Sequence, residues 1–421
     1  MTIIHVPRRF TTSHWGGTES VVLEVAARQQ RLGHQVAIWC PDALADRREE
    51  VLEGVEVRRF PYFYPFWGLS PEGRRAMDLK GGNLVSFPLM TALLRLPRLD
   101  ILHLHTGNRL GGIVRTVAAI RRIPYFLTIH GGLEDIPESE QQSYREARQG
   151  ALEWGKVLGW ALGSHRVTRD AAGVLVLGRR EEEALRRRDP RVRVHRFCNG
   201  VDPARFEGGD GRAFRQRHGV PEGARVLLQV GRIDPQKAQR TSLEVLEGLL
   251  PRFPDLHLVL VGPVTHEAYA AQVRHAVQRM APHATLIPGL PAGTSELRDA
   301  YAAAEVLLLP SVHEPFGIAI LEGWAAGLPV VAFEVGGVPD IIRHDQDGIL
   351  VPSGDIGAFG DALAALLRDP DRGRAMGARG RDRVQGEFHW DQVVHRLMTL
   401  YGEARSTMAP KGGRGSSGRS A

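Results

Sequence analysis

The alternation of short apolar runs with amphipathic helices constrains the fold of this chain more than any other feature. The runs are rich in Val, Ile and Leu, and their polar residues lie mostly at the ends. This pattern is typical of parallel strands that are covered on both faces. In the first half of the chain we expect strands at residues 2–6, 35–40, 55–60, 101–105, 125–129, 173–177 and 192–197. Residues 20–32 place apolar side chains at helical spacing, and Gly33 ends that helix.

The same alternation begins again after residues 210–223, which are rich in turn-forming Gly, Arg and Pro. We expect the second set of strands at residues 225–230, 256–261, 284–287, 306–309, 330–333 and 349–351. Strands that alternate with helices predict a doubly wound α/β domain. The fold class predicted is therefore α/β, with two Rossmann-like domains that face each other across a ligand cleft.

The turn-rich segment and the restart of the pattern also suggest the domain boundaries. We expect an N-terminal domain at residues 1–198 and a C-terminal domain at 199–387. A last helix at 390–404 is expected to pack back on the N-terminal domain. Residues 408–421 have no apolar pattern and are expected to be disordered.

Composition limits the compartment and the class of partner. Two cysteines in 421 residues cannot supply a disulfide framework, and no run of apolar residues reaches the length of a signal peptide or a membrane span. A cytoplasmic protein is therefore expected. The formal net charge of +6 suits an anionic partner such as a nucleotide or a membrane headgroup. Nucleic acid is disfavoured because no reader motif accompanies the charge.

The densest chemical signal is the string SVHEPFGIAILEGWAAG at residues 311–327. It follows an expected buried strand and opens a helix near Gly317, whose free N–H groups would form an anion site beside Phe316 and Ile318. Glu322 would stand about 7 Å along the helix, within reach of a ribose. Glu314, on the other side of the phosphates, could bind the hydroxyls of an attached sugar. Taken singly, either glutamate could instead be an ordinary surface charge.

This string resembles the signature of the family-four retaining glycosyltransferases, which have the two-domain GT-B fold. Four further segments resemble motifs of the same family in the same order along the chain. They are HWGGTE at 14–19, TIHGG at 128–132, CNGVD at 198–202 and VGRIDPQKAQ at 230–239. The likeness covers nearly the whole chain. Cys198 stands where the family often has Pro, and Ala238 where Gly often follows the phosphate-binding Lys.

The resemblance implies roles for individual residues. Arg232 and Lys237 would bind the donor diphosphate, and His130 would bind a sugar hydroxyl as a candidate catalytic residue beside Glu314. Gly16 and Gly17 would form an acceptor or phosphate loop. A front-face transfer with retention is implied, in which the leaving diphosphate helps to deprotonate the acceptor. We expect a hexosyltransferase-type enzyme that needs no metal and no further cofactor.

Three other patterns are weaker. Asp345-Gln346-Asp347 looks like a metal-binding Asp-x-Asp, but the glycine that follows favours a turn. His103 and His105 lie two apart and could bind zinc, yet no third ligand is evident in the sequence nearby. Gly336-Gly337 lacks the spacing of a dinucleotide fingerprint.

The prediction is a glycosyltransferase that uses a UDP-sugar or GDP-sugar and a hydroxyl acceptor. A lipid-linked saccharide of cell-surface polysaccharide biosynthesis is the expected acceptor, with peripheral association at the inner face of the cytoplasmic membrane. This expectation rests on the basic charge, the aromatic segment 58–69 and the amphipathic segment 84–96. Segment 58–69 could equally be a loop folded over its own small core.

Alternatives with the same fold are a sugar phosphorylase, a sucrose-type or trehalose-type synthase, and a nucleotide-sugar epimerase. A non-catalytic nucleotide-binding regulator is the alternative from another class.

Overall fold

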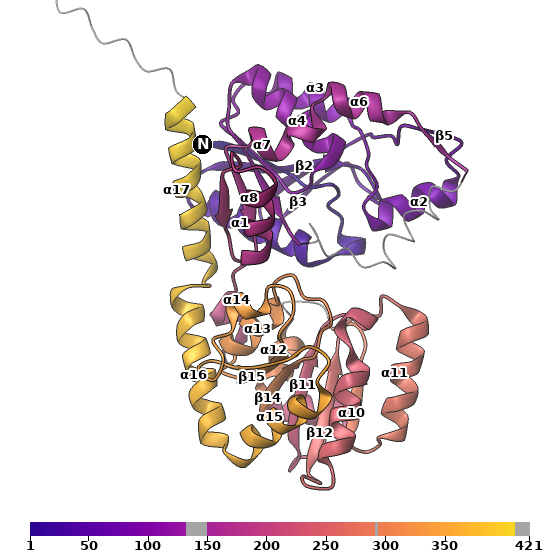
Figure 1. Ribbon diagram of the computed structural model, residues 1–421, viewed down its shortest axis with the longest axis vertical. Coiled ribbons are helices and arrows are strands. Elements are labelled where there is room, and N and C mark those ends of the chain that lie inside the picture. The colour runs from indigo at the N-terminus through magenta and orange to yellow at the C-terminus, as the bar shows by residue number, and fades with distance from the viewer. Residues whose placement is uncertain (132–149, 291–293, 409–421) are drawn as a thin grey trace, which may run out of the picture. The chain divides into compact units, whose positions relative to one another are not determined.

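The structure is a computed structural model, and it describes residues 1–131, 150–290 and 294–408. The chain forms two compact units (Figure 1). The first comprises Met1–Val176, Ala184–His195 and the chain from Val394 onward, and the second comprises Leu177–Glu183 and Arg196–Val393. The main segment of the second unit begins at Arg196, near the predicted boundary at residue 198, and the short segment 177–183 also belongs to that unit. Gly132 and the predicted tail from residue 409 lie outside the described residues.

The first unit contains an eight-stranded sheet in the order β10-β9-β7-β6-β1-β2-β4-β3. From β9 to β4 adjacent strands are parallel, and at the edge β3 runs antiparallel to β4. The strands are β1 (Thr2–Val6), β2 (Gln35–Pro41), β3 (Glu49–Leu52), β4 (Val55–Phe60), β6 (Ile101–Leu104), β7 (Tyr125–Ile129), β9 (Gly173–Val176) and β10 (Val194–Arg196). A separate antiparallel pair is formed by β5 (Phe66–Trp67) and β8 (Leu152–Glu153).

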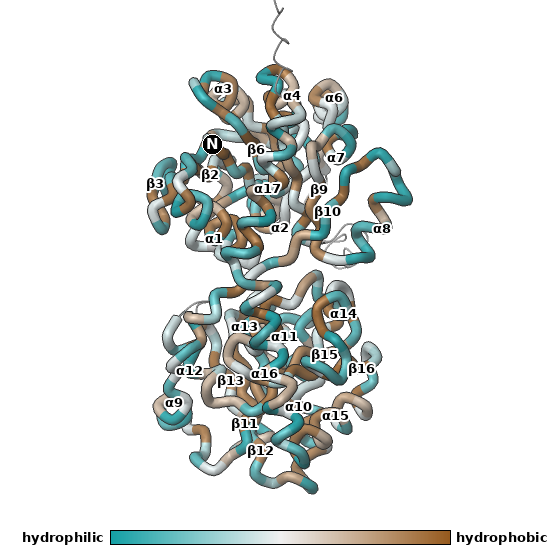
Figure 2. Tube along the Cα trace, turned by 90° about the vertical axis from the view of Figure 1, so that its left-hand side faces the viewer, coloured by the Kyte–Doolittle hydropathy of each residue, from teal (hydrophilic) through white to brown (hydrophobic). Residues whose placement is uncertain are grey.

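Helices follow the strands of the first unit. They are α1 (Gly17–Arg31), α2 (Pro71–Lys80), α3 (Phe87–Arg95), α4 (Asn108–Arg121), α6 (Gly155–Ala161), α7 (Val167–Asp170), α8 (Arg179–Arg188) and α17 (Trp390–Met408), with the short η1 (Thr12–His14) and η2 (Ser164–Arg166). The first residues of α8 and of α17 belong to the second unit. Ser70 and Ser86 accept hydrogen bonds from the first turns of α2 and α3, which begin with Pro71 and Phe87-Pro88. Hydropathy falls from the buried strands to the arginine-rich helix α8 (Figure 2).

The second unit contains a six-stranded, all-parallel sheet in the order β13-β12-β11-β14-β15-β16. The strands are β11 (Arg225–Val230), β12 (Leu256–Val261), β13 (Ala284–Ile287), β14 (Val306–Leu309), β15 (Val330–Phe333) and β16 (Ile349–Val351). The helices are α9 (Gly211–His218), α10 (Gln239–Leu249), α11 (Glu267–Arg279), α12 (Ser295–Ala302), α13 (Ile318–Ala325), α14 (Val338–Ile341), α15 (Ile356–Arg368) and α16 (Pro370–Gly386), with η3 (Pro203–Phe206) and η4 (Pro235–Lys237).

The strand order of this sheet is that of a doubly wound Rossmann fold, because the chain moves outward from β11 to β13 and then crosses to β14. Right-handed crossovers on either side of β11 then place helices on both faces. Helix α10 contacts α11 and α15, whereas α13 contacts α16 and α12 contacts α9. All six strands predicted for this half are confirmed, as are the seven of the first half to within a few residues at their ends.

The sequence missed β3, β5 and β8, which are edge strands or two-residue strands. Strand β3 alternates exposed and half-buried residues, so it carries no buried apolar run. Among the described residues, no helix is long and apolar enough to cross a membrane.

Candidate functional site

In the second unit, the strand order reverses between β11 and β14, which are adjacent and parallel. The carboxyl ends of two such strands open a crevice where doubly wound domains bind ligands. The loop after β11 carries Arg232 and Lys237, and the loop after β14 carries Glu314. The topology therefore brings the predicted donor-binding residues to one edge of the sheet.

The loop after β11 is held by hydrogen bonds to its own backbone. Gln229 donates from Nε2 to the carbonyl of Lys237 over 2.6 Å, and Gln239 donates to the carbonyl of Arg232 over 2.8 Å. Ala238 follows Lys237 with a φ of 50°, in the left-handed region. A glycine would adopt this conformation at lower energy, since a residue with a Cβ pays about 1–2 kcal/mol at positive φ.

Lys237 and Glu314 form an ion pair between the two loops, and both side chains are largely buried. Ser311 lies 3.5 Å from the same carboxylate oxygen of Glu314. The backbone also joins the loops, because Val312 donates to the carbonyl of Gln236 over 2.9 Å. A cation and a carboxylate thus stand together at the strand ends, where each is shielded from water and interacts strongly with charge.

Two glycines allow another loop to approach Glu314 closely. A Cβ at Gly336 would lie 2.1 Å from the carbonyl oxygen of Glu314, and one at Gly337 would lie 2.3 Å from that of Pro315. Gly337 donates its N–H to the carbonyl of Glu314 over 3.0 Å. Gly336-Gly337 therefore buttresses the loop that carries the carboxylate, a role that the sequence did not reveal.

Helix α13 begins at Ile318, directly after Gly317, whose φ of 97° requires a glycine-like backbone. Phe316 is buried in the core of the second unit, and Ile318 packs against that core. Their side chains therefore shape the turn, and it is the backbone of this turn that could contact a ligand.

Arg232 is exposed, and its side chain makes no ion pair with any residue that the structure describes.

Glu322 lies one turn into α13 and accepts a 2.6 Å hydrogen bond from the hydroxyl of buried Tyr301. Burial raises the pKa of Glu322, and the bond from Tyr301 partly opposes this shift. The remaining lone pairs of this carboxylate could accept bonds from ligand hydroxyls.

In the first unit, the strand order reverses between β1 and β6. Gly16 and Gly17 follow β1: Gly16 is the N-cap residue of α1, and Gly17 is its first residue. A Cβ at Gly16 would lie 3.2 Å from a carboxylate oxygen of Glu19, which itself lies 3.5 Å from Arg9. The predicted loop is thus at a sheet edge, flanked by one acidic and one basic side chain.

Four histidines gather beside this edge: His5 on β1, His103 and His105 at the end of β6, and His130 after β7. His5 Nδ1 lies 2.9 Å from His105 Nε2, and His105 Nδ1 lies 3.0 Å from His130 Nε2. The predicted residue His130 is therefore the outer member of a histidine cluster. The sequence missed His5, although its place on β1, beside β6 in a doubly wound sheet, could have indicated it.

Burial lowers the pKa of every histidine in this cluster. The pKa of His5 falls to about 4, against the opposing effect of its bond to Gln29, and that of His130 falls to about 4. Burial also lowers the pKa of His103 and His105 well below the ordinary value, and the neighbouring imidazoles add to the effect. The four rings are therefore neutral at pH 7.

His5, His103 and His105 lie close enough together to hold a metal ion. His5 is thus the third possible ligand that was not evident in the sequence near His103 and His105. Hydrogen bonds nevertheless use both ring nitrogens of each. His103 bonds to Thr128 over 2.7 Å and to Tyr401 over 2.5 Å, and His5 bonds to Gln29 over 2.8 Å. A metal would have to displace these bonds.

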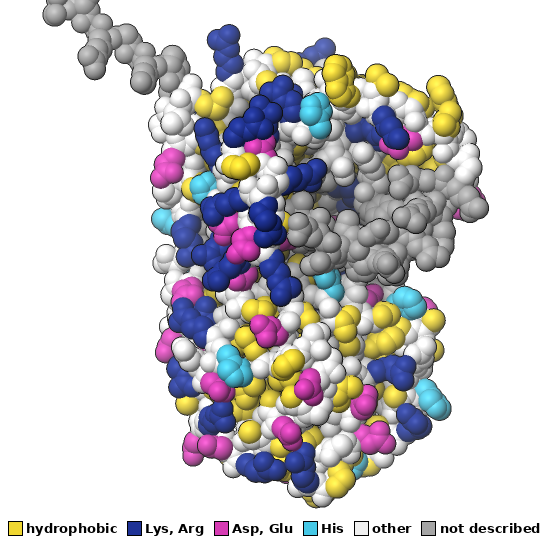
Figure 3. Space-filling model, viewed as in Figure 1, with side chains coloured by type: hydrophobic (Ala, Val, Ile, Leu, Met, Phe, Trp, Pro, Cys, Tyr) yellow, Lys and Arg dark blue, Asp and Glu magenta, His cyan; other side chains and the backbone are white. Residues whose placement is uncertain are grey.

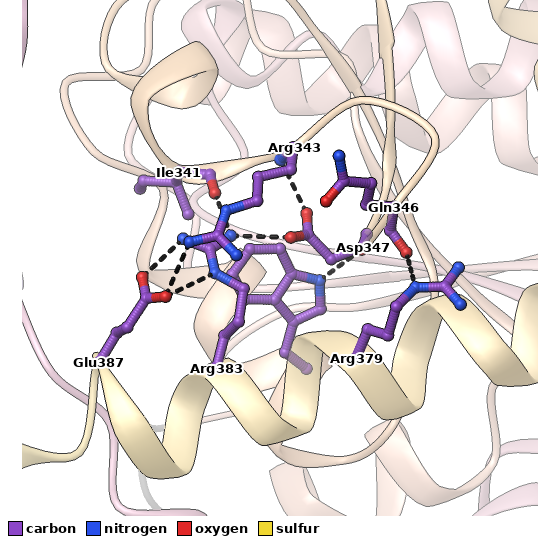
Figure 4. A network of polar contacts seen from close by, with 8 residues as sticks. Ile341, Arg343, Gln346, Asp347, Arg379, Arg383 and Glu387 are labelled. Atoms are coloured by element: carbon purple, nitrogen blue, oxygen red, sulfur yellow. Dashed lines mark hydrogen bonds and ion pairs between the residues drawn. The ribbon is translucent and has the colours of Figure 1, made fainter.

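The Asp-x-Asp motif forms a turn, as the glycine after it indicated. Asp347 is buried and accepts hydrogen bonds from the backbone of Arg343 and from Arg383, each over 2.8 Å (Figure 4). Arg383 in turn binds Glu387 over 2.9 Å. Both oxygens of Asp347 are thus engaged in holding α16 to the β15–β16 connection.

Segment 58–69 contains both buried and exposed aromatics. Phe60 and Tyr64 are buried, whereas Trp67 is 63% exposed. The ring centroids of Trp67 and Trp154 lie 6.2 Å apart, and the two rings are tilted by 32°. Hydrophobic side chains line this edge along α3, α6 and β5 (Figure 3). We call the exposed hydrophobic residues on β5, on β8 and at or near α6 the aromatic patch, which consists of Trp67, Leu152, Trp154, Val157 and Trp160.

Both halves of the chain match models of known protein families. Residues 16–200 match the model of the glycosyl transferase 4-like domain, and residues 210–383 match that of glycosyl transferases group 1. The D-inositol 3-phosphate glycosyltransferase of Kribbella flavida is 30% identical, over 94% of this chain and 93% of its own length. The enzyme of that name from Kineococcus radiotolerans is 32% identical, over 96% and 94%.

Solved structures show the same architecture at low sequence identity. Sucrose-phosphate synthase from Thermosynechococcus elongatus is similar with a TM-score of 0.70 at 20% identity, over 97% of this chain and 100% of its own. Anabaena HepE, solved in complex with UDP, has a TM-score of 0.71 at 16% identity, over 96% and 100%. The chain therefore belongs to the GT-B glycosyltransferases that combine a glycosyl transferase 4-like domain with a group 1 domain.

Proposed function

We propose that this enzyme transfers a sugar from a nucleoside diphosphate donor, UDP-linked or GDP-linked, to a hydroxyl acceptor with retention at the anomeric carbon. The observation that carries the proposal is the buried pair of Lys237 and Glu314 at the point where the strand order of the second unit reverses. A cation there suits a diphosphate, and a carboxylate beside it suits sugar hydroxyls.

The ion pair suggests how donor binding prepares the site. Without a ligand, Lys237 and Glu314 neutralise each other. A bound diphosphate would draw Lys237 to its oxygens, together with exposed Arg232 and the N-terminal turn of α13. Glu314 would then be free to accept hydrogen bonds from the sugar, while Glu322 binds the ribose. The charge that develops on the leaving diphosphate is stabilised by groups already in place.

In the transfer step, the bond between the anomeric carbon and the diphosphate oxygen breaks, and the acceptor oxygen bonds to that carbon on the same face. The acceptor proton passes to an oxygen of the leaving diphosphate. No side chain is a covalent nucleophile in this scheme, and no metal ion or further cofactor is part of it. His130 binds a hydroxyl of the transferred sugar.

Two acceptor classes follow from different observations. The names of the curated relatives support a phosphorylated polyol, because those proteins are D-inositol 3-phosphate glycosyltransferases. The aromatic patch supports a lipid-linked saccharide of polysaccharide biosynthesis, because exposed Trp side chains favour the interface of a bilayer. We place the phosphorylated polyol first, since the relatives span nearly the full chain.

Donor binding is tested by the thermal shift of the purified protein with UDP, GDP, ADP and their sugars. We expect one base to stabilise the protein, and Lys237→Met to abolish that stabilisation. Lys156→Met is the matched control, because Lys156 is an exposed lysine of α6 in the first unit. Equal stabilisation of both variants by the same nucleotide would contradict the assignment of the diphosphate to Lys237.

The acceptor is tested with the donor found in that screen, labelled in its sugar. Transfer to inositol phosphates or sugar phosphates would support the phosphorylated polyol, and transfer only to lipid extracts would support the lipid-linked saccharide. Release of free sugar or epimerised donor, with no acceptor used, would refute transfer. Co-sedimentation with anionic liposomes that is unchanged in Trp67→Ser/Trp160→Ser would refute membrane contact through the aromatic patch.

A further inference from the structure

Two histidines, His5 and His105, connect a buried glutamine to His130 through an unbroken series of hydrogen bonds. Gln29 Oε1 lies 2.8 Å from His5 Nε2, His5 Nδ1 lies 2.9 Å from His105 Nε2, and His105 Nδ1 lies 3.0 Å from His130 Nε2. Gln29, His5 and His105 are all buried. The transfer chemistry described above uses only His130, so the other three have no role in it.

The direction of these bonds follows from the number of protons. A neutral imidazole has one N–H donor and one unprotonated acceptor nitrogen. The amide oxygen of Gln29 can only accept, so His5 carries its proton on Nε2 and accepts at Nδ1. His105 must then donate from Nε2 and accept at Nδ1. By the same rule, His130 donates from Nε2, and its Nδ1 carries a lone pair.

A second, separate set of hydrogen bonds runs through His103. The hydroxyl of Tyr401 lies 2.5 Å from His103 Nδ1, and His103 Nε2 lies 2.7 Å from the hydroxyl of Thr128. Burial raises the pKa of Tyr401, and the Gln29 side chain acts in the opposite direction. Gln29 Nε2 is buried and makes no hydrogen bond to any residue that the structure describes, so this second set is not hydrogen-bonded to Gln29. The orientation of Gln29 is therefore given by the contact of its amide oxygen with His5 alone.

We propose that Gln29, His5 and His105 are positioning residues that fix the tautomer and the ring orientation of His130, so that His130 presents an unprotonated Nδ1 to a substrate hydroxyl. Among the residues that the structure describes, His130 Nδ1 has no hydrogen-bond partner. The identity of that hydroxyl as one of the transferred sugar rests on the proposed function. The tautomer itself does not, and it can be measured without substrate.

The structure supplies a matched pair of variants. His5 and His103 are directly opposite each other on paired strands β1 and β6, and both are almost fully buried. Only His5 belongs to the series that ends at His130. His5→Leu therefore breaks the series, whereas His103→Leu makes the same change of side chain and also removes two hydrogen bonds, neither of which involves His105.

The experiment is nitrogen NMR of protein labelled at the histidine rings, with the His130 signals assigned by their loss in His130→Gln. Protonated and unprotonated ring nitrogens have well-separated shifts. We expect His130 in the unchanged protein to be protonated on Nε2 at pH 7. In His5→Leu, at least a third of His130 should adopt the other tautomer and kcat should fall about tenfold with little change in donor KM. His103→Leu should retain the original tautomer.

Other outcomes would overturn the proposal. These are His130 protonated on Nδ1 in the unchanged protein, the same change of tautomer in both Leu variants, or a stoichiometric zinc ion held by His5, His103 and His105. If His5→Leu does not fold, scalar coupling across the N–H···N bond between His105 and His130 decides the matter in the unchanged protein, and its absence refutes the series. The expected tautomer in a protein that transfers no sugar would instead refute the proposed function alone.

Discussion

Replacing Gly336 with alanine tests whether the Gly336-Gly337 loop positions Glu314. The new Cβ would lie 2.1 Å from the carbonyl oxygen of Glu314, and such atoms do not approach within 3.0 Å. The Glu314 backbone must therefore move by nearly 1 Å. The positive φ adds about 1–2 kcal/mol of strain, and the overlap adds about 1–3 kcal/mol. A displacement of about 1 Å in a catalytic group can lower turnover about 100-fold.

The control is Gly354→Ala, which has a positive φ of 81° but no atom within 4 Å of the added Cβ. Backbone strain alone should lower the stability of this variant by about 1–2 kcal/mol, which is equivalent to a fall of roughly 2–8 °C in its melting temperature. We expect Gly354→Ala to keep its turnover and Gly336→Ala to lose at least tenfold, with a melting temperature lowered further. The reasoning is refuted if both variants have the same turnover and melting temperature when each is assayed at saturating donor.

The remaining predictions concern charge. Lys237→Met should raise the Kd of the nucleoside diphosphate at least tenfold in calorimetric titration, because a charge-assisted bond is lost; an unchanged Kd would place the diphosphate elsewhere. Glu314→Gln should lower kcat far more than Glu322→Gln, and equal losses in initial-rate assays would contradict the division of roles. The folded state lowers the pKa of His5 to about 4, so the unfolded state binds the extra proton as the pH falls below about 6.5. Between pH 7 and pH 5 this should remove about 2 kcal/mol of stability, and a His5→Leu variant whose melting temperature falls as steeply as that of the unchanged protein would refute it.

The parallel strands were predictable because they are buried on both faces and so read as continuous apolar runs. Strand β14 is fully buried and was predicted with its observed ends. Strand β3 has the sequence EEVL at the edge of the sheet, and only its pairing with β4 makes it a strand. The exchange of residues 177–183 to the second unit depends on tertiary contacts that no local pattern encodes.

The site was predictable where motif and strand end coincide, as for Lys237 and Glu314. The contact between these two side chains also requires β11 and β14 to be neighbours, which follows from the doubly wound order. The buttress at Gly336 was not predictable, because it depends on the approach of two backbones far apart in the sequence. The link from His5 to His130 was missed for a similar reason, since its members come from three strands and each histidine alone is unremarkable.

Helix α17 has a consequence for the order in which the units can fold during translation. Its residues from Val394 onward belong to the first unit, where Tyr401 completes the hydrogen bonds of buried His103. The ribosome makes these residues about 200 positions after Val176, when every residue of the second unit has already been synthesised. Although nascent chains generally fold from the N-terminus, the second unit, with its donor-binding loops, is the first part of this chain that can complete its structure.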